Sequence, residues 1–330
     1  MYIKIAGAGL SGLSCALNLA KNDIKVDVFE RENCVGKKYG LSVLAFKAYE
    51  TNILEELKSA SIPTSNLFPI YKIRRYAPSM RYFETYSNKP LYFSVIRGPE
   101  GSLEEMLLNE CMDRNVQFFF NQTSNADVIA TGARFTHFIG ISKTFKNKDK
   151  LDHISLFYSP LASGGYFYII PYGDYITAGG VFDAASVVSP LKNFNEFFHK
   201  KLGLTENAIH TVVSKANYFH SSCFDKLYVG EAAGLLEPSR GFGMRTALIS
   251  GKLAADAISN RKDYNNSLSS LFKELAKGEK IRDVYSLMEE SDFERLIDFM
   301  GQNLSIEEYK AKKELLQSRK FRDRLSDPKE

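Results

Sequence analysis

A glycine-rich turn within the first twelve residues constrains this chain more than any other feature. The segment "YIKIAGAGLSG" begins as an apolar run typical of a buried parallel strand and breaks at Gly7, Gly9 and Gly12. The next residues place leucine and alanine at helical spacing and stop near residues 22–23. "KVDVFE" then predicts a second strand that ends on Glu30. This order of strand, loop, helix, strand and acid predicts one β-α-β unit of about thirty residues.

The residues of this unit match the needs of a dinucleotide. Gly7 allows a tight turn, Gly9 lets the backbone approach a pyrophosphate, and Gly12 lets the helix pack closely on the strand. The helix N-terminus offers free N–H groups and a partial positive charge. Glu30 is placed to accept hydrogen bonds from ribose hydroxyls. The sequence therefore predicts a dinucleotide site, although this motif alone leaves NAD and FAD open.

A second glycine-rich segment decides between the two cofactors. In "YVGEAAGLLEPSRGFGM", Glu231 follows a strand and a glycine, and Gly241 and Gly243 open a long helix. The acid is placed to take ribityl hydroxyls, and the helix N-terminus to face the flavin edge where negative charge builds on reduction. We therefore expect FAD, bound non-covalently because no His or Cys has a recognisable flavinylation context.

With these motifs the chain resembles the FAD-dependent oxidoreductases of the para-hydroxybenzoate hydroxylase fold, and within them the geranylgeranyl reductase family. The likeness rests on "GAGLSGLSCALNLA…VFERE", the arginine before a helix, "DVIATGA" and "VGEAAGLLEPSRGFGMRTAL". It also rests on "GGYFYIIPYGDYITAGGVF", which is similar to that family's Y-x-W-x-F-P segment. The likeness covers most of residues 1–260. Glu231 stands where the family usually has Asp, and the middle of the chain is shorter.

The resemblance implies an α/β fold: a Rossmann-like FAD-binding domain, an inserted antiparallel-sheet substrate domain and a helical C-terminal tail. The FAD-binding domain is discontinuous in this prediction. The expected division is 1–60, 97–140 and 221–260 for FAD, 61–96 and 141–220 for the substrate domain, and 261–330 for the helical region.

The resemblance also implies roles for particular residues. Arg97 should lie beside the flavin or pyrophosphate, with an exposed strand-end arginine as the alternative. Lys38 is either a flavin contact or a solvated loop lysine. Cys34 is the one candidate for a catalytic group, although a lone cysteine is more often an apolar filler. The expected cofactor-binding residues are Gly7, Gly9, Leu10, Ser11, Gly12, Glu30, Arg31, Lys38, Arg97, Gly132, Glu231, Gly241, Phe242, Gly243 and Met244. The expected substrate-pocket residues are Tyr166, Tyr168 and Pro171.

The implied activity is reduction of carbon–carbon double bonds in an isoprenoid, geranylgeranyl-type lipid by hydride from reduced flavin. No second dinucleotide motif appears, so the electrons are expected from NAD(P)H or a ferredoxin-like donor. Two alternatives remain open. One is a flavin monooxygenase or hydroxylase, because a fold does not fix a function. The other is a flavin-binding protein without turnover.

Composition limits the remaining possibilities. The net charge is +4 with acids and bases mixed along the chain, which argues against a nucleic-acid partner. The four cysteines form no CxxC pair and no zinc spacing with histidine, so no metal is expected and a reducing cytoplasm fits. No apolar run approaches the ~20 residues that cross a bilayer. The early glycine turn leaves no room for an N-terminal signal. We expect a cytoplasmic protein, with peripheral membrane contact left open.

Overall fold

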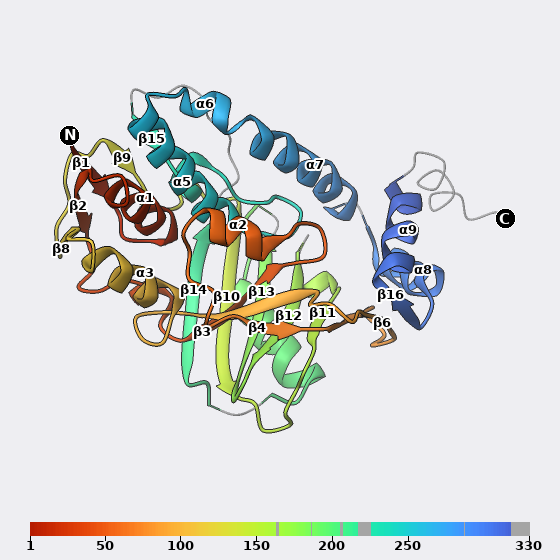
Figure 1. Cartoon of the computed structure of the whole chain (residues 1–330). Coiled ribbons are helices and arrows are strands. Elements are labelled where there is room, and N and C mark those ends of the chain that lie inside the picture. Colours follow the sequence, from red (N-terminus) through yellow and green to blue (C-terminus); the bar gives the residue numbers. More distant parts are fainter. Residues whose placement is uncertain (163–164, 186, 205–206, 217–225, 287, 318–330) are drawn as a thin grey trace.

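The computed structural model describes residues 1–162, 165–185, 187–204, 207–216, 226–286 and 288–317. In these residues the chain forms a parallel sheet, a large mixed sheet and a small antiparallel sheet (Figure 1). The parallel sheet has the order β15-β9-β1-β2-β8 and is assembled from segments far apart in the sequence. Its strands are β1 (Tyr2–Ala6), β2 (Lys25–Glu30), β8 (Gln117–Phe120), β9 (Val128–Ile129) and β15 (Leu227–Tyr228).

Helices pack closely on this sheet because small residues lie between them. α1 (Leu10–Ala20) is buried along nearly its whole length between the sheet and α5 (Met244–Asn260), with α3 (Leu103–Met112) beside it. A Cβ atom added at Gly251 of α5 would lie 2.3 Å from the carbonyl oxygen of Ser11. The glycine therefore permits the close contact of the two helices, and the Rossmann-like part of the fold is as the sequence predicts.

The large sheet has the order β14-β10-β13-β12-β11-β5-β6-β16. Its neighbouring strands are antiparallel except for the β11–β5 and β16–β6 pairs, which are parallel. Its strands are β5 (Lys72–Tyr76), β6 (Tyr82–Tyr86), β10 (Phe138–Lys146), β11 (Ile154–Phe157), β12 (Tyr166–Tyr172), β13 (Tyr175–Asp183), β14 (His210–Ala216) and β16 (Asn303–Ser305).

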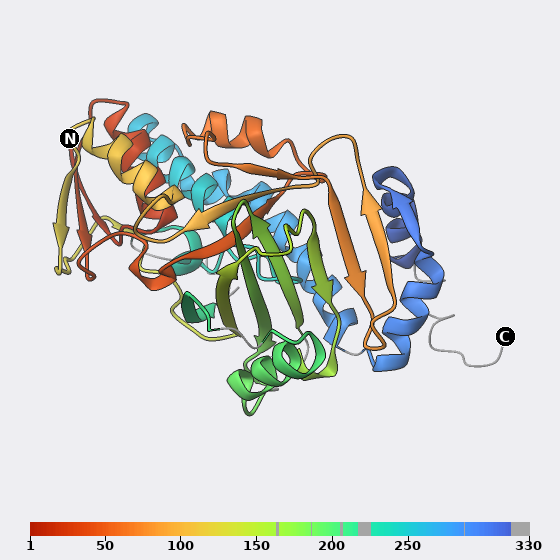
Figure 2. The ribbon, with the colours of Figure 1, turned by 90° about the horizontal axis from the view of Figure 1, so that it is seen from below.

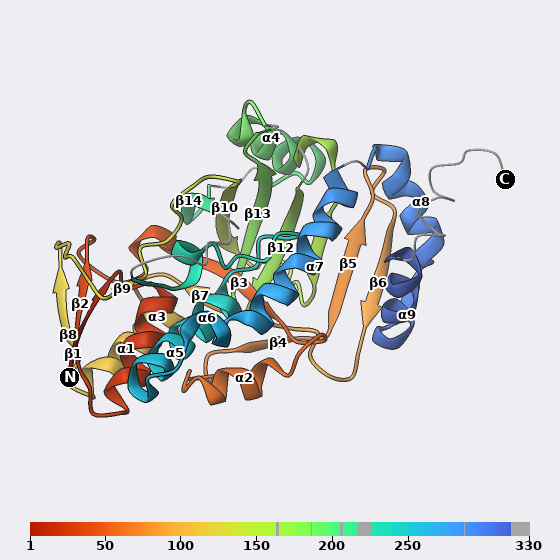
Figure 3. The same ribbon diagram turned by 90° about the horizontal axis from the view of Figure 1, so that it is seen from above.

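The two faces of the large sheet pack against different elements. One face buries phenylalanines under α4 (Pro190–Asn195) and the π-helical turn Glu196–Lys201. The other packs on the small sheet of β3 (Ser42–Lys47), β7 (Tyr92–Arg97) and β4 (Phe68–Ile70). Figure 2 and Figure 3 show α4 and α2 (Ile53–Ser59) on opposite sides of the molecule. Alternating residues of β12 therefore belong to two different cores.

The C-terminal region is mostly helical but contains one strand. α6 (Tyr264–Ser267) leads into α7 (Ser269–Ser286), which crosses towards α8 (Glu290–Met300) and α9 (Ile306–Gln317) (Figure 3). Between the last two helices, β16 pairs in parallel with β6. The expectation of a wholly helical region is therefore wrong at this point, because the edge strand β6 offers backbone groups that β16 satisfies. In the part of the chain that the structure describes, no helix is long and apolar enough to cross a membrane.

Strand membership cuts across the expected domain boundaries. β3 lies within 1–60 yet pairs with β7 in the small sheet, and β10 begins at Phe138 in the large sheet. The division into domains stays a prediction.

Candidate functional site

A cavity lies where the parallel sheet, the large sheet and the late glycine-rich loop meet. Its volume is about 210 Å³. The glycine loop, the end of β9, the end of β7, four strands of the large sheet and the start of α5 all contribute to its walls. The predicted residues that line it are Gly9, Leu10, Ser11, Arg97, Gly132, Tyr168, Glu231, Gly241, Gly243 and Met244.

The three glycines of the first loop have different surroundings. Gly7 has a φ of +103°, and a Cβ there would lie 2.4 Å from the carbonyl oxygen of Ala130. A Cβ at Gly12 would lie 2.0 Å from the carbonyl oxygen of Gly7. A Cβ at Gly9 would meet no atom within 4 Å, and Gly9 lines the cavity. Gly7 and Gly12 therefore hold the turn and the helix together, while Gly9 leaves space for a ligand.

Two helix N-termini face the cavity. α1 begins after Gly9 and α5 begins after Gly243, and neither cap residue makes a side-chain hydrogen bond to its helix. The first residues of both helices line the cavity. Uncapped N-terminal amides carry partial positive charge, so both ends favour negative groups in this space.

Glu30 supports the loop rather than lining the cavity. Its carboxylate accepts hydrogen bonds from the backbone N–H of Ala8 (2.8 Å) and the backbone N–H of Glu32 (3.0 Å). Arg31 is exposed and lies 3.6 Å from the Glu32 carboxylate. Glu30 thus holds the glycine loop against the end of β2, and Arg31 points to solvent.

Glu231 is the acid that borders the cavity. A Cβ at Gly132 would lie 4.0 Å from its Oε2 atom. Burial raises the pKa of Glu231, while the positive charges of Lys38 and Arg97 and the backbone N–H of Ala133 act in the opposite direction. The carboxyl group is therefore short of hydrogen-bond donors for its charged form, and hydroxyl groups of a ligand could supply them.

Arg97 is buried and paired. It is 4% exposed, and its Nε and Nη2 atoms lie 2.6 and 2.5 Å from Oε1 of Glu104. Its guanidinium carbon lies 4.1 Å from the ring centre of Tyr39. Burial alone would lower the pKa of Arg97, but the Glu104 carboxylate outweighs it and raises that pKa. The exposed alternative is wrong. The sequence analysis also missed Glu104, whose signal is an acid in the first turn of the helix that follows Arg97.

The predicted substrate residues diverge along β12. The ring of Tyr168 lines the cavity and lies over Gly179, where a Cβ would be 2.0 Å from the ring carbon Cζ. The Tyr166 hydroxyl donates a hydrogen bond to the carbonyl oxygen of Arg240 at 2.6 Å. Pro171 does not line the cavity, and its carbonyl accepts a hydrogen bond from Ser94 at 2.7 Å. Only Tyr168 of the three therefore borders the cavity.

Other predicted residues lie outside the cavity lining. Cys34 is half-buried and not in a disulfide. Phe242 packs towards Tyr92, with ring centres 6.4 Å apart. Lys38 is exposed, although its charge acts on Glu231. No cluster of acids, histidines or cysteines in the described ranges could hold a metal ion.

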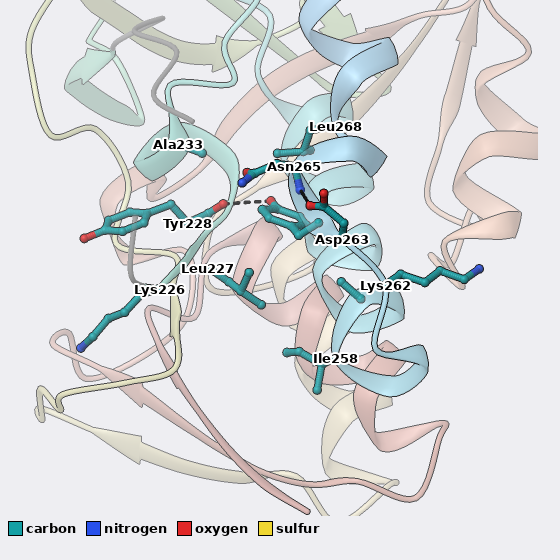
Figure 4. Close-up of a pocket in the computed structure, with 11 residues that line it drawn as sticks. Lys226, Leu227, Tyr228, Ala233, Ile258, Lys262, Asp263, Asn265 and Leu268 are labelled. Atoms are coloured by element: carbon teal, nitrogen blue, oxygen red, sulfur yellow. Dashed lines mark hydrogen bonds between the residues drawn. The ribbon is translucent and has the colours of Figure 1, made fainter. Parts of the chain in front are cut away.

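A second pocket lies between β15, the end of α5 and α6 (Figure 4). In this pocket the Tyr264 hydroxyl donates to the Tyr228 carbonyl at 2.8 Å. The backbone N–H of Asn265 donates to Asp263 at 2.9 Å, which caps α6. None of the predicted site residues lines this pocket.

Residues 5–39 match the family of NAD(P)-binding Rossmann-like domains. Digeranylgeranylglycerophospholipid reductase 3 of Methanosphaera stadtmanae is 32% identical over 165 residues. The match spans 44% of this chain and 41% of that protein, so it covers less than half of either. The uncharacterized protein Mbar_A1602 of Methanosarcina barkeri is 24% identical over 306 residues, with 78% of this chain and 74% of that protein matched.

Solved structures match over nearly the whole chain. A geranylgeranyl bacteriochlorophyll reductase-like protein of Thermoplasma acidophilum has a TM-score of 0.78 at 16% identity, covering 98% of this chain and 99% of that one. PqsL of Pseudomonas aeruginosa, described as a probable FAD-dependent monooxygenase, has a TM-score of 0.61 at 16% identity, covering 90% of this chain and 100% of that one. The fold is thus that of the flavin-dependent oxidoreductases of the para-hydroxybenzoate hydroxylase group. The Methanosphaera protein and the Thermoplasma structure are the ones among these that carry a geranylgeranyl reductase description.

Proposed function

We propose that the cavity binds FAD non-covalently. The residues present fit this cofactor: Gly9 leaves room for the pyrophosphate, and the uncapped starts of α1 and α5 favour its charge and that of the flavin edge. Glu231 borders the cavity and can accept hydrogen bonds from ribityl hydroxyls in addition to the one from the Ala133 backbone N–H. Glu30 keeps the loop in the shape that exposes Gly9. When bound and reduced, FAD would supply the hydride for one carbon of a double bond, and an acid or water would supply the proton for the other.

We further propose that the substrate is an isoprenoid, geranylgeranyl-type lipid. The observation that carries this proposal is the position of β12. Tyr168 borders the cofactor cavity, and Tyr166 belongs to the aromatic core between the large sheet and α8 and α9. One strand thus connects the cofactor to an apolar interior that can exclude water and orient a hydrocarbon chain. Burial raises the pKa of Tyr168, so its hydroxyl keeps its proton beside the cavity.

The alternative with support is a monooxygenase. PqsL shares this fold, and a fold alone does not separate reduction from oxygen chemistry. A flavin-binding protein without turnover is the third candidate. The electron donor that we propose is NAD(P)H or a ferredoxin-like protein, and the proposed location is the cytoplasm with peripheral access to lipid.

Anaerobic reoxidation of the reduced protein tests this function. Acid precipitation should first release FAD, and release of FMN, NAD or nothing would refute the cofactor assignment. Stopped-flow absorbance should then show reoxidation by prenyl diphosphates or prenyl ether lipids, with saturated products. Reoxidation by oxygen alone, with hydroxylation of an aromatic, would establish the monooxygenase. A flavin that no acceptor reoxidises would favour the protein without turnover.

A further inference from the structure

A buried arginine lies on β5, a strand of the large sheet near α8 and α9 (Figure 3), and no carboxylate of the described residues pairs with it. Arg75 of β5 is 1% exposed, in phase with Ile73 on the inward face of its strand. Its Nη1 atom donates to the Thr85 hydroxyl at 3.0 Å. Its Nε and Nη2 atoms are buried and have no hydrogen-bond partner among the residues that the structure describes.

Aromatic rings surround this guanidinium. Its carbon lies 4.3 Å from the ring centre of Tyr309 and 5.4 Å from that of Phe83. Burial alone would lower the pKa of Arg75, but the electrostatic effect of the tyrosines 309, 49, 92 and 158 outweighs it and raises that pKa. Phenol groups can donate hydrogen bonds to an oxyanion as well as pack against a chain.

The acids nearest to this region are already engaged. Glu50 lies 2.8 Å from the ammonium group of Lys47 and 2.7 Å from that of Lys313. Glu237 accepts hydrogen bonds from the backbone N–H of Ser239 and the backbone N–H of Arg240. A buried charge that lacks a partner is costly, so an oxyanion from outside the chain would satisfy Arg75.

Ring contacts connect this place to the cofactor cavity. Phe242 lies between two glycines of the cavity wall and 6.4 Å from the Tyr92 ring. Tyr92 lies 5.7 Å from Tyr49, and Tyr49 lies 6.1 Å from Tyr309, measured between ring centres. Tyr309 in turn covers Arg75. These contacts form a continuous series of rings from the cavity wall to Arg75.

We propose that Arg75, with Tyr309 and the neighbouring tyrosines, binds the phosphate-type oxyanion at the end of the substrate. The guanidinium offers the two free nitrogens, Nε and Nη2, to oxygens of a phosphate or diphosphate, the geometry in which arginine binds such groups best. This inference rests on the proposed function and narrows its substrate class to an apolar chain that ends in a phosphate-type group.

Calorimetric titration of the FAD-loaded protein with three probes tests the site: inorganic diphosphate, geranylgeranyl diphosphate and uncharged geranylgeraniol. Arg75→Met should weaken binding of both diphosphates by about 10- to 100-fold, the loss expected for charge-assisted hydrogen bonds. Binding of geranylgeraniol should stay the same. Arg74→Met is the matched control, because Arg74 lies on the same strand, is partly exposed and pairs with Glu84 at 2.8 Å. It should change none of the three titrations.

The outcomes separate the sources of the oxyanion. Arg75-dependent binding of inorganic diphosphate identifies a site that takes the free anion as well, whereas dependence for geranylgeranyl diphosphate alone identifies a lipid head group. Equal binding of geranylgeranyl diphosphate by the natural protein and Arg75→Met, or none by the natural protein, overturns the proposal. If Arg75→Met no longer binds FAD, the variant Arg75→Lys is tested instead. Lysine keeps the positive charge but lacks the two parallel N–H donors of the guanidinium. Unchanged diphosphate binding by this variant would overturn the site, and weakened binding would support it.

These experiments distinguish a failure of the proposed reductase function from a failure of the proposed anion site at Arg75. Arg75-dependent diphosphate binding without reoxidation by any prenyl compound would refute the reductase and leave the site. Equal reoxidation by the diphosphate and the alcohol, with no effect of Arg75→Met on either, would refute the site and leave the reductase.

Discussion

Two buried arginines show how the cofactor region differs from the aromatic core. Arg97 and Arg75 are both nearly inaccessible, and each guanidinium lies within 4.3 Å of a tyrosine ring centre. Arg97 has Glu104 beside it, whereas Arg75 has the Thr85 hydroxyl as its one hydrogen-bond partner among the residues that the structure describes. The fold has neutralised the first charge by itself. An anionic ligand would neutralise the charge of Arg75, because an unpaired buried cation costs stability.

The residues that surround the two regions also differ in kind. The cofactor cavity is built from glycines, helix ends and an acid, so most of its binding groups belong to the backbone. The core around Arg75 is built from large rings on elements far apart in the sequence, including α9. In the proposed function, the first region would recognise its ligand by backbone shape, and the second by side chains.

The largest expected effect comes from substitutions in the glycine loop, where Gly9 borders the cavity and Gly12 packs against backbone. Gly9→Val should reduce FAD affinity more than about 100-fold, because its branch would occupy open cavity space. Its backbone is extended (φ −79°, ψ 178°), so the cofactor-free variant should unfold at the same temperature as the natural protein. Gly12→Val, whose Cβ would meet the Gly7 carbonyl, should lower that temperature instead. Unchanged FAD occupancy in Gly9→Val would contradict the site.

The next effect compares the two arginines directly. Glu104→Ala leaves Arg97 buried without its carboxylate and should cost about 3–5 kcal/mol of unfolding free energy. Arg75→Met removes a charge that has no carboxylate, so it should be neutral or stabilising by about 1–4 kcal/mol in the absence of an anion. Denaturant unfolding measures both. A similar loss in the two variants would mean that Arg75 is as well paired as Arg97.

The sequence predicts the first region better than the second for a physical reason. The glycine loop, Glu30 and α1 are neighbours in the chain, so their spacing already contains the geometry. Glu104 pairs with Arg97 only after β7 and α3 have folded together. Alternation along "KIRRY" does place Arg75 in phase with Ile73, which is the available signal for its burial. Nothing local connects Arg75 to Tyr309, which comes from α9.

A smaller effect is expected at the acid of the cavity. Glu231→Ala should weaken FAD binding by about 1–3 kcal/mol, the scale of hydrogen bonds to a charged group. Glu231→Asp should be tolerated, since the shorter acid is the usual residue of the family that the chain resembles. FAD titration of the cofactor-free protein measures both. Equal losses in the two variants would show that the carboxylate does not hold the ribityl chain.

The smallest effect is a shift in one titration, and it tests the unpaired arginine without any substitution in the cofactor region. Burial alone would raise the pKa of Tyr309, but Arg75, Arg240 and two lysines outweigh it and lower that pKa to about 8. A lowered pKa contributes stability above the unfolded value of about 10, and this contribution is lost as the pH falls through 8. As the pH rises from about 8 to about 10, the free energy of unfolding of the natural protein should therefore increase relative to that of Tyr309→Phe.

Inorganic diphosphate should raise the pKa of Tyr309, because an oxyanion at Arg75 cancels the charge that stabilises the phenolate. The difference in tyrosinate absorbance between the natural protein and Tyr309→Phe, with and without diphosphate, measures the shift. A Tyr309 titration that diphosphate leaves unchanged would place the anion elsewhere.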